Sequence, residues 1–337
     1  MSRAPLPTTL RGHERREAGR QYVDMKGAPL PNRVTVFERS TMKRLRNALA
    51  RVLVKIPDSL FDKLLVFLPS SRRNAVMHKR ARARFHWYVG EKVGGFMVET
   101  DPGPVGPDEI IMKTAVLNKA EAPRQLDPDI YFEKAYRQLL DWLQLLERHS
   151  FNLRTLGSVL ELGCGSARLI RHFRCLQGVR LVGTDVIPES VAWCQQNIPG
   201  VEFYVNDLTP PLKFAADSCV DLVYAASVFT HIPMETRDLW IQEMYRILRP
   251  GGFLLCDVLG RYHQQRMLGK EDREQLRKQG HFTLTAKDPK ASLSTQLIGS
   301  WDVFMTRAEV LKAFGSRFQV LDYIPSTLDL LVLQKPR

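Results

Sequence analysis

From Ser158 onward, the sequence alternates short β-rich runs with segments of helical periodicity. This alternation is typical of β-α-β units, in which helices connect parallel strands. The expected strands are Val159–Leu162, Arg180–Thr184, Val201–Val205, Val220–Ala226 and Phe253–Val258, and the expected helices are Arg168–Leu176, Pro188–Gln196 and Glu235–Leu248. The pattern therefore predicts an α/β protein with a doubly wound, mostly parallel sheet.

The last part of the chain follows a different pattern. A helical segment at Arg307–Phe314 precedes two β-rich runs, Phe318–Ile324 and Leu328–Gln334, which are separated only by Pro325, Ser326 and Thr327. A connection this short cannot cross over the sheet, so the two strands must be antiparallel. The sequence predicts a parallel sheet that ends in an antiparallel hairpin.

Composition excludes several classes of protein. The chain has 337 residues, of which 44% are hydrophobic and 25% charged, which is typical of a globular protein and not of a disordered or fibrous one. No apolar run reaches the length of a membrane span, and residues 1–24 lack the apolar core of a signal peptide, so we expect a cytoplasmic protein. The five cysteines show no Cys-x-x-Cys spacing, so we expect neither a disulfide nor a zinc site.

Positive charge is concentrated in the first half of the chain. The net charge is +13, and residues 39–84 contain 13 Lys and Arg against 2 Asp and Glu. We therefore expect a mobile tail at 1–38, a basic helical region with a linker at 39–128, and an α/β domain at 129–337 that begins with a helix at Asp129–His149.

Three interpretations of the basic segment 39–84 remain open. It can be an amphipathic cover for the α/β domain, with its charges in solvent. Its cationic helices can instead contact an anionic membrane, which would place the protein peripherally at the inner membrane face. It can also bind nucleic acid, with Phe85, Trp87 and Tyr88 stacking on bases, although no RNA-binding motif is present, so we rank this partner below the other two.

A glycine-rich turn follows the first expected strand. Gly163 and Gly165 allow the backbone to turn tightly and to approach a ligand closely. A dinucleotide-binding turn would carry a third glycine where Arg168 stands, and the acid at Glu161 suits a cationic ligand better than a pyrophosphate.

Further candidate ligand-binding residues lie at the ends of the next three strands. Asp185 ends the second strand, 22 residues after Gly163, where a carboxylate can accept both hydroxyl groups of a ribose. Asn206, Asp207 and Leu208 follow the third strand, and Ala226 ends the fourth. Because the carboxyl ends of parallel strands share one edge, the sequence predicts a ligand site there.

Together with the string Met244–Gly252 before the fifth strand, these residues make the chain resemble the class I S-adenosylmethionine-dependent methyltransferases over about residues 129–337. The resemblance implies S-adenosylmethionine as cofactor and a seven-stranded sheet of order 3-2-1-4-5-7-6 with strand 7 antiparallel. It also implies that the methionine end is held by Glu161 and the Gly163–Gly165 loop, the ribose by Asp185, the adenine by Asp207 and the Leu208 amide, and the amino group by the Ala226 backbone. The chain departs from many members at Ala167, where they have a third glycine.

Two histidines are candidates for catalysis. His231 lies just beyond the fourth strand, where an imidazole can act as general base near neutral pH or simply line the site. His263 lies in an insertion at 260–301, which is longer than the connection requires. We expect this insertion to be a substrate lid, and the alternative is a solvated excursion.

The methyl acceptor is the least constrained part of the prediction. Residues 226–229 lack the Pro-Pro string of enzymes that methylate base or amide nitrogens, and no cysteine follows a proline as pyrimidine C5 chemistry requires. The pattern from Trp301 to Leu333 resembles bacterial methyltransferases of small molecules and sugars. We therefore expect metal-independent O-methylation of a small molecule, saccharide or lipid-linked intermediate. The alternatives are a non-catalytic cofactor-binding module that acts on a membrane or RNA through its basic arm, and an RNA or protein methyltransferase.

Overall fold

The structure is a computed structural model, and it describes residues 52, 54–94, 102–105, 127–292, 295 and 300–337. The chain divides into two compact units, residues 1–52 and residues 53–337, and every described residue except Val52 belongs to the second. The predicted tail, the start of the basic segment and most of the predicted linker lie outside the described residues, and the predicted domain boundaries stay predictions.

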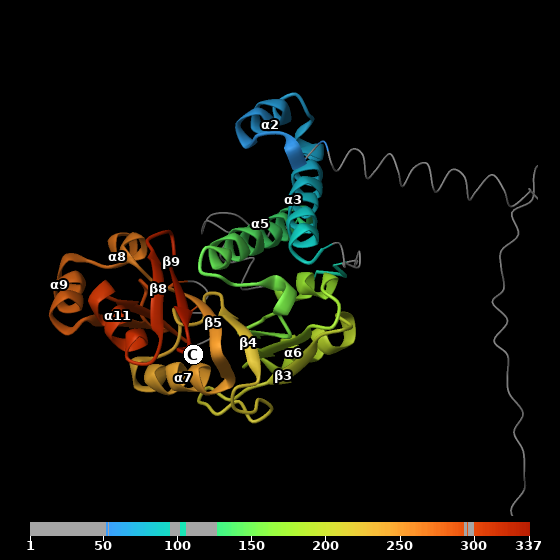
Figure 1. Ribbon diagram of the computed structural model, residues 1–337. Helices are drawn as coiled ribbons and strands as arrows, with labels where there is room; N and C mark the ends of the chain where they lie inside the picture. Colours follow the sequence, from blue (N-terminus) through green and yellow to red (C-terminus); the bar gives the residue numbers. More distant parts are fainter. Residues whose placement is uncertain (1–51, 53, 95–101, 106–126, 293–294, 296–299) are drawn as a thin grey trace, which may run out of the picture. The chain divides into compact units, whose positions relative to one another are not determined.

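The second unit contains a seven-stranded sheet of order β3-β2-β1-β4-β5-β9-β8 (Figure 1). All neighbours are parallel except β9, which is antiparallel to both β5 and β8. The predicted order is confirmed, because β8 and β9 are the sixth and seventh strands of this sheet. The strands are β1 Ser158–Leu162, β2 Arg180–Asp185, β3 Glu202–Val205, β4 Val220–Ala225, β5 Leu248–Val258, β8 Gln319–Ile324 and β9 Asp329–Gln334.

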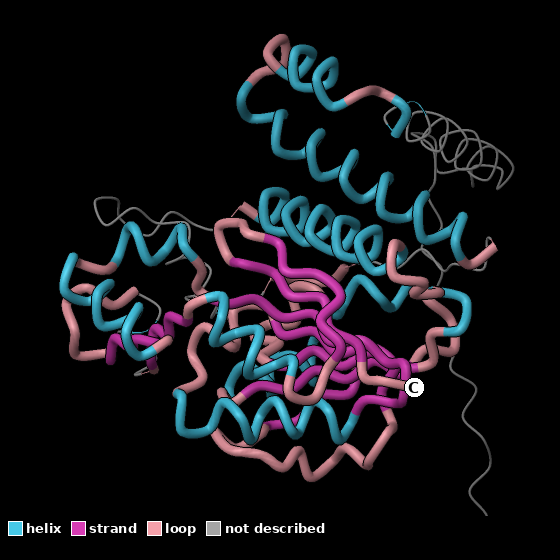
Figure 2. Tube along the Cα trace, turned by 60° about the vertical axis from the view of Figure 1, so that its left-hand side comes forward, coloured by secondary structure: helices cyan, strands magenta, loops and turns pink. Residues whose placement is uncertain are grey.

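Side chains of the central strands alternate between two hydrophobic cores, one on each face of the sheet. On β4, Leu222 and Tyr224 face one core, whereas Val223 and Ala225 face the other. Helices cover both faces (Figure 2). The first core includes residues of α3 Ser70–Lys92, α5 Pro128–Glu147 and α6 Pro188–Asn197, and the second includes residues of α7 Met234–Ile247 and α11 Arg307–Gly315.

The basic stretch of the sequence forms part of a long helix, α3, which follows the short helix α2 Asp58–Leu65. Ala81, Phe85 and Val89 recur every four residues and are buried against α5 in the first core. The many cations between them hide this periodicity in the sequence. The expectation that Phe85 stacks on bases is wrong, because its side chain is fully buried.

The helix predicted at Arg168–Leu176 is instead the 3₁₀ helix η2, Ile170–Cys175. Here side chains form hydrogen bonds with backbone groups that would bond to one another in an α-helix. The Ile170 amide donates to the Glu161 carboxylate at 3.0 Å, and the Arg171 guanidinium donates to the carbonyl oxygens of Ser166 and Ala167. The first α-helical turn therefore does not form.

The insertion after β5 folds around a small core of its own, which includes Leu268, Leu276 and Leu284. It contains the short helix α8 Arg261–Met267 and the charged helix α9 Lys270–Gln279. Two strands that were not predicted, β6 His281–Thr285 and β7 Trp301–Met305, pair antiparallel.

The 3₁₀ helix η1 Leu153–Thr155 precedes β1. All five cysteines are free thiols, and only Cys219 among them is not fully buried. In the part of the chain that the structure describes, no helix is both long and apolar enough to cross a bilayer.

Candidate cofactor and acceptor site

The glycine-rich turn leaves β1 with both glycines in the left-handed region, Gly163 at φ +68° and Gly165 at φ +50°. A Cβ atom on Gly163 would lie 2.4 Å from Cγ2 of Val228, so Gly163 is needed where the turn packs against the segment after β4. A Cβ atom on Gly165 would meet nothing within 4 Å. The backbone at Gly165 therefore borders open space, as a cofactor-binding turn requires.

Asp185, at the end of β2, lies directly beside this turn. Its Oδ2 accepts a hydrogen bond from the Gly165 amide at 2.7 Å, and its Oδ1 accepts one from the Ile187 amide at 3.0 Å. Burial raises the pKa of Asp185 above its usual value. The structure thus brings together two residues predicted to bind the cofactor.

Glu161 is a buried acid at the other side of the turn. Its Oε2 accepts hydrogen bonds from the Ile170 amide at 3.0 Å and from the Tyr224 hydroxyl at 3.2 Å. Burial raises the pKa of Glu161 to about 8. A cation bound nearby would favour the ionised form, so the site is suited to a positively charged ligand.

The residues after β3 are much more exposed. The Asp207 carboxylate forms an ion pair with Lys213 at 3.1 Å, and the Leu208 side chain is 67% exposed while its carbonyl oxygen accepts from Trp240 Nε1 at 3.0 Å. Val186 and Val205, at the ends of the neighbouring strands β2 and β3, are exposed as well. Exposed apolar side chains at this edge leave a surface that a flat base could cover.

The end of β4 holds an acid that the sequence analysis missed. After Ala226, Ser227 turns with φ +57°, and its amide donates to Asp257 Oδ1 at 2.7 Å. Asp257, on β5, is buried, and burial raises its pKa to about 7. In the sequence, Asp257 could have been recognised as a single carboxylate within an otherwise apolar strand.

Side chains from outside the predicted motif also hold the turn. The Tyr131 hydroxyl of α5 lies 3.3 Å from Ser166 Oγ, and Arg168 Nη2 donates to Gln138 Oε1 of the same helix at 2.7 Å. Arg171, which is fully buried, donates to the Pro104 carbonyl oxygen at 2.6 Å. The region before β1 is therefore attached directly to the turn, which the sequence analysis did not foresee.

His231, just beyond the end of β4, makes contacts that fit one tautomer of the neutral ring. Its Nδ1 lies 2.7 Å from the Trp301 carbonyl oxygen, 3.3 Å from Thr295 Oγ1 and 3.9 Å from Asp302 Oδ1. Because a carbonyl oxygen can only accept, Nδ1 carries the hydrogen of the neutral ring and Nε2 keeps its lone pair. Asp302 itself is 1% exposed and accepts a hydrogen bond from Thr295 at 2.7 Å.

His263, the second predicted catalytic residue, lies on α8. Burial lowers its pKa, and the charges of Asp302 and Asp329 partly offset that effect. Both histidines thus lie within the electrostatic reach of Asp302, which the sequence analysis missed. Asp302 is another lone acid in an apolar strand, β7.

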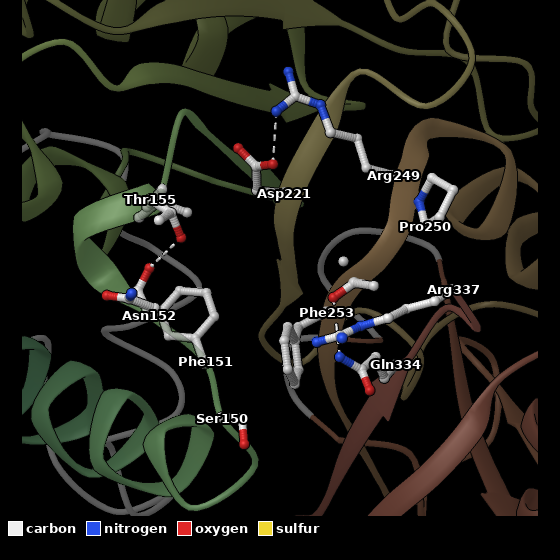
Figure 3. A pocket seen from close by; sticks show the side chains of 13 residues that line it. Ser150, Phe151, Asn152, Thr155, Asp221, Arg249, Pro250, Phe253, Gln334 and Arg337 are labelled. Carbon is white, nitrogen blue, oxygen red and sulfur yellow. Dashed lines mark hydrogen bonds and ion pairs between the residues drawn. The ribbon is translucent and has the colours of Figure 1, made fainter.

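A separate pocket lies at the opposite, amino-terminal edge of the sheet (Figure 3). Asp221 there accepts from the Gly157 amide at 2.8 Å and pairs with Arg249 at 2.8 Å, so it ties together the starts of β1, β4 and β5. These contacts stabilise the sheet, and none of the predicted site residues lines this pocket.

Residues 160–256 match the methyltransferase domain family. The chain is similar to a tRNA N(3)-methylcytidine methyltransferase of Schizosaccharomyces pombe, with 26% identity over 51% of this chain and 69% of that protein. It is also similar to the mitochondrial ubiquinone biosynthesis O-methyltransferase of Rattus norvegicus, with 27% identity over 35% of each chain, so that match spans about a third of the relative.

Among solved structures, a SAM-dependent methyltransferase from Methanosarcina mazei is similar, with 21% identity, a TM-score of 0.40, and coverage of 53% of this chain and 92% of that one. The family match, the sheet order and the glycine-rich turn between β1 and η2 agree with one another. Residues 160–256 therefore match a methyltransferase domain, and this family implies S-adenosylmethionine as the cofactor, as predicted.

Proposed function

We propose that this protein transfers a methyl group from S-adenosylmethionine to a hydroxyl oxygen of a small molecule, saccharide or lipid-linked intermediate, with His231 as general base. The observation that carries the proposal is the contact between His231 Nδ1 and the Trp301 carbonyl oxygen at 2.7 Å. A base for a hydroxyl must present an unprotonated nitrogen, and in the neutral ring this contact places the hydrogen on Nδ1 and leaves Nε2 with its lone pair.

The residues predicted from the sequence hold the cofactor in this proposal. Asp185 takes the ribose hydroxyls, and Glu161 takes the positively charged methionine end together with the Gly163–Gly165 loop. Asp207 and the Leu208 amide border the adenine, and the Ala226 backbone accepts from the amino group. The open space beside Gly165 and the exposed Val186 and Val205 support this placement.

The cofactor, when bound, supplies an electrophilic methyl group. The chain's own residues then align the acceptor and remove its proton. Transfer of the methyl group would break its bond to sulfur and leave S-adenosylhomocysteine, while the proton of the acceptor hydroxyl passes to His231 Nε2. The Asp302 carboxylate, 3.9 Å from Nδ1, stabilises the imidazolium that results. In this proposal His263 of α8 also contacts the acceptor, and the 260–301 insertion covers the acceptor as a lid.

A second candidate is methylation of an RNA base nitrogen. The similarity to a tRNA methyltransferase over half of this chain favours it. A neutral ring nitrogen already carries a lone pair, so this reaction needs no general base. The two candidates therefore differ in how strongly they depend on His231.

The test measures methyl transfer from labelled S-adenosylmethionine to a pool of hydroxylated small molecules and saccharides and, separately, to total tRNA. We expect transfer to the first pool, and we expect His231→Gln to lower kcat by roughly 10²- to 10⁴-fold with cofactor affinity unchanged. His281→Gln, in β6, is the matched control and should be neutral.

Transfer to tRNA alone, or full activity in His231→Gln, would overturn the proposal. Cofactor binding without transfer to either pool would favour a non-catalytic module.

A further inference from the structure

A group of large apolar side chains is exposed on α2 and the turn that follows it. We call Leu60, Leu64, Val66 and Phe67 the α2 patch, and Val66 and Phe67 are 67% and 85% exposed. Leu60 and Leu64 are four residues apart on α2 and lie on one side of the helix, and Phe67 lies in the turn after it, where its amide donates to the Leu64 carbonyl oxygen at 3.2 Å. Methyl transfer gives no role to this patch.

The opposite side of α2 is firmly attached to α3. Phe61 is buried beneath the Arg80 guanidinium, whose carbon lies 4.0 Å from the ring centroid. Asp58 accepts hydrogen bonds from Arg80 at 2.6 Å and from Arg84 at 2.8 Å. Since these contacts fix which side of α2 faces α3, the exposure of the patch follows from the packing.

The turn after α2 is fixed as well. Arg73 donates to the Leu68 carbonyl oxygen at 3.0 Å and to the Val66 carbonyl oxygen at 3.1 Å. These bonds hold the backbone of Val66 and Phe67 against the first turns of α3. The most exposed side chains of the patch therefore stand on an ordered backbone.

Positive charge accompanies the patch. Lys55, Lys63, Arg72 and Lys79 are all exposed in the same part of the chain, and Glu91 is the only acid among the many cations of α3. Exposed apolar side chains flanked by cations are typical of helices that lie in the membrane interface. Anionic headgroups complement the cations and the acyl region accepts Leu and Phe, whereas a nucleic acid offers aliphatic side chains no apolar phase.

We propose that the α2 patch attaches the protein to an anionic lipid surface. Leu60, Leu64 and Phe67 enter the boundary between headgroups and acyl chains, while Lys63 and Arg72 face the lipid phosphates. This inference is independent of the methyl acceptor.

The test is co-sedimentation of the full chain with phosphatidylcholine vesicles, with and without phosphatidylglycerol. We expect binding only when phosphatidylglycerol is present, and we expect Leu64→Ser with Phe67→Ser to lower the partition coefficient by about tenfold or more. Leu239→Ser, which changes an exposed leucine of α7, is the matched control and should bind as the unchanged chain does.

A second set of variants tests whether the cations beside the α2 patch contribute to vesicle binding. Lys63→Glu with Arg72→Glu should weaken binding to anionic vesicles at low salt, and Lys278→Glu on α9 should not. Added salt should weaken binding of the unchanged chain but leave a fraction that only the Leu64 and Phe67 substitutions remove.

Each substitution lies on the surface, so circular dichroism should show an unchanged fold. Vesicle binding that survives the Leu64 and Phe67 substitutions would overturn the proposal. A dimer in solution that these substitutions dissociate would also overturn it, because the patch would then belong to a contact between copies. Loss of RNA binding in the same variants, without any vesicle binding, would assign the patch to nucleic acid instead.

Discussion

The Asp185 carboxylate accepts a hydrogen bond from the Gly165 amide, 20 residues earlier in the chain, at 2.7 Å. This bond couples the end of β2 to the glycine-rich turn, where a Cβ atom on Gly165 would meet only open space. We therefore predict that Asp185→Ala weakens S-adenosylmethionine binding about ten- to a hundredfold, because charge-assisted bonds to two hydroxyl groups are lost. Isothermal titration calorimetry measures the change.

Asp185→Asn serves as the comparison for that prediction. It keeps one oxygen that can accept from the Ile187 amide or a hydroxyl, so its affinity should lie between those of the unchanged chain and Asp185→Ala. Unchanged affinity in a folded Asp185→Ala variant would contradict the role of Asp185.

Alanine substitutions at the two glycines should separate folding from binding. Gly163→Ala places a Cβ atom 2.4 Å from Val228, so we predict a clear loss of thermal stability. Gly165→Ala places its Cβ atom in open space, so the expected cost to stability is only the positive φ, about 1 kcal/mol. Cofactor affinity should fall in Gly165→Ala although the protein stays folded, and equal affinity there would mean that the open space is not the cofactor site.

Glu161 should make cofactor binding depend on pH. Its pKa is raised to about 8 by burial, so the group is largely protonated at pH 7 before the ligand binds. A bound cation lowers that pKa, so binding should release protons near pH 7 and affinity should rise as the pH increases from about 6 to about 8. Calorimetry in buffers of different ionisation enthalpy counts the protons.

Two comparisons test this assignment to Glu161. S-adenosylhomocysteine, which lacks the sulfonium charge, should release fewer protons than S-adenosylmethionine. Glu161→Gln should bind without the pH dependence, and an unchanged dependence in that variant would assign the proton to another group.

Asp257 should make stability fall as the pH rises. Its pKa is about 7 in the folded protein, whereas the unfolded chain ionises near the usual value of 3.8. Because the unfolded state loses its proton first, the free energy of unfolding should decline between about pH 4 and pH 7.

Asp257→Asn removes this contribution and can still accept from the Ser227 amide. We predict that it raises the free energy of unfolding above pH 7 by on the order of 2–4 kcal/mol, measured by urea denaturation. Below pH 4 the two proteins should be equally stable. A difference that does not change with pH would contradict the assignment to Asp257.

Asp302 should act through His231. Asp302→Asn removes the charge 3.9 Å from His231 Nδ1, so the imidazolium becomes less stable and kcat should fall by roughly tenfold or more. A change in KM alone would indicate that Asp302 only shapes the pocket.

Several features of this protein follow from the sequence alone. The β-α-β alternation, the antiparallel end of the sheet and the positions of Glu161, Gly163, Gly165 and Asp185 were all predicted. These features depend on local pattern, because a strand, a glycine turn and the residue at a strand's end are specified within a few neighbouring residues. The roles of these residues in binding stay predictions.

Other features depend on contacts between distant parts of the chain. The Glu161 carboxylate and the Arg171 guanidinium replace the first turn of a predicted α-helix, and Phe85 is buried although cations surround it in the sequence. Asp257 and Asp302 join the site only because β5 and β7 carry them to Ser227 and His231. The tertiary structure decided these features, because burial and long-range hydrogen bonds determine which polar groups meet, and a sequence window does not contain both partners.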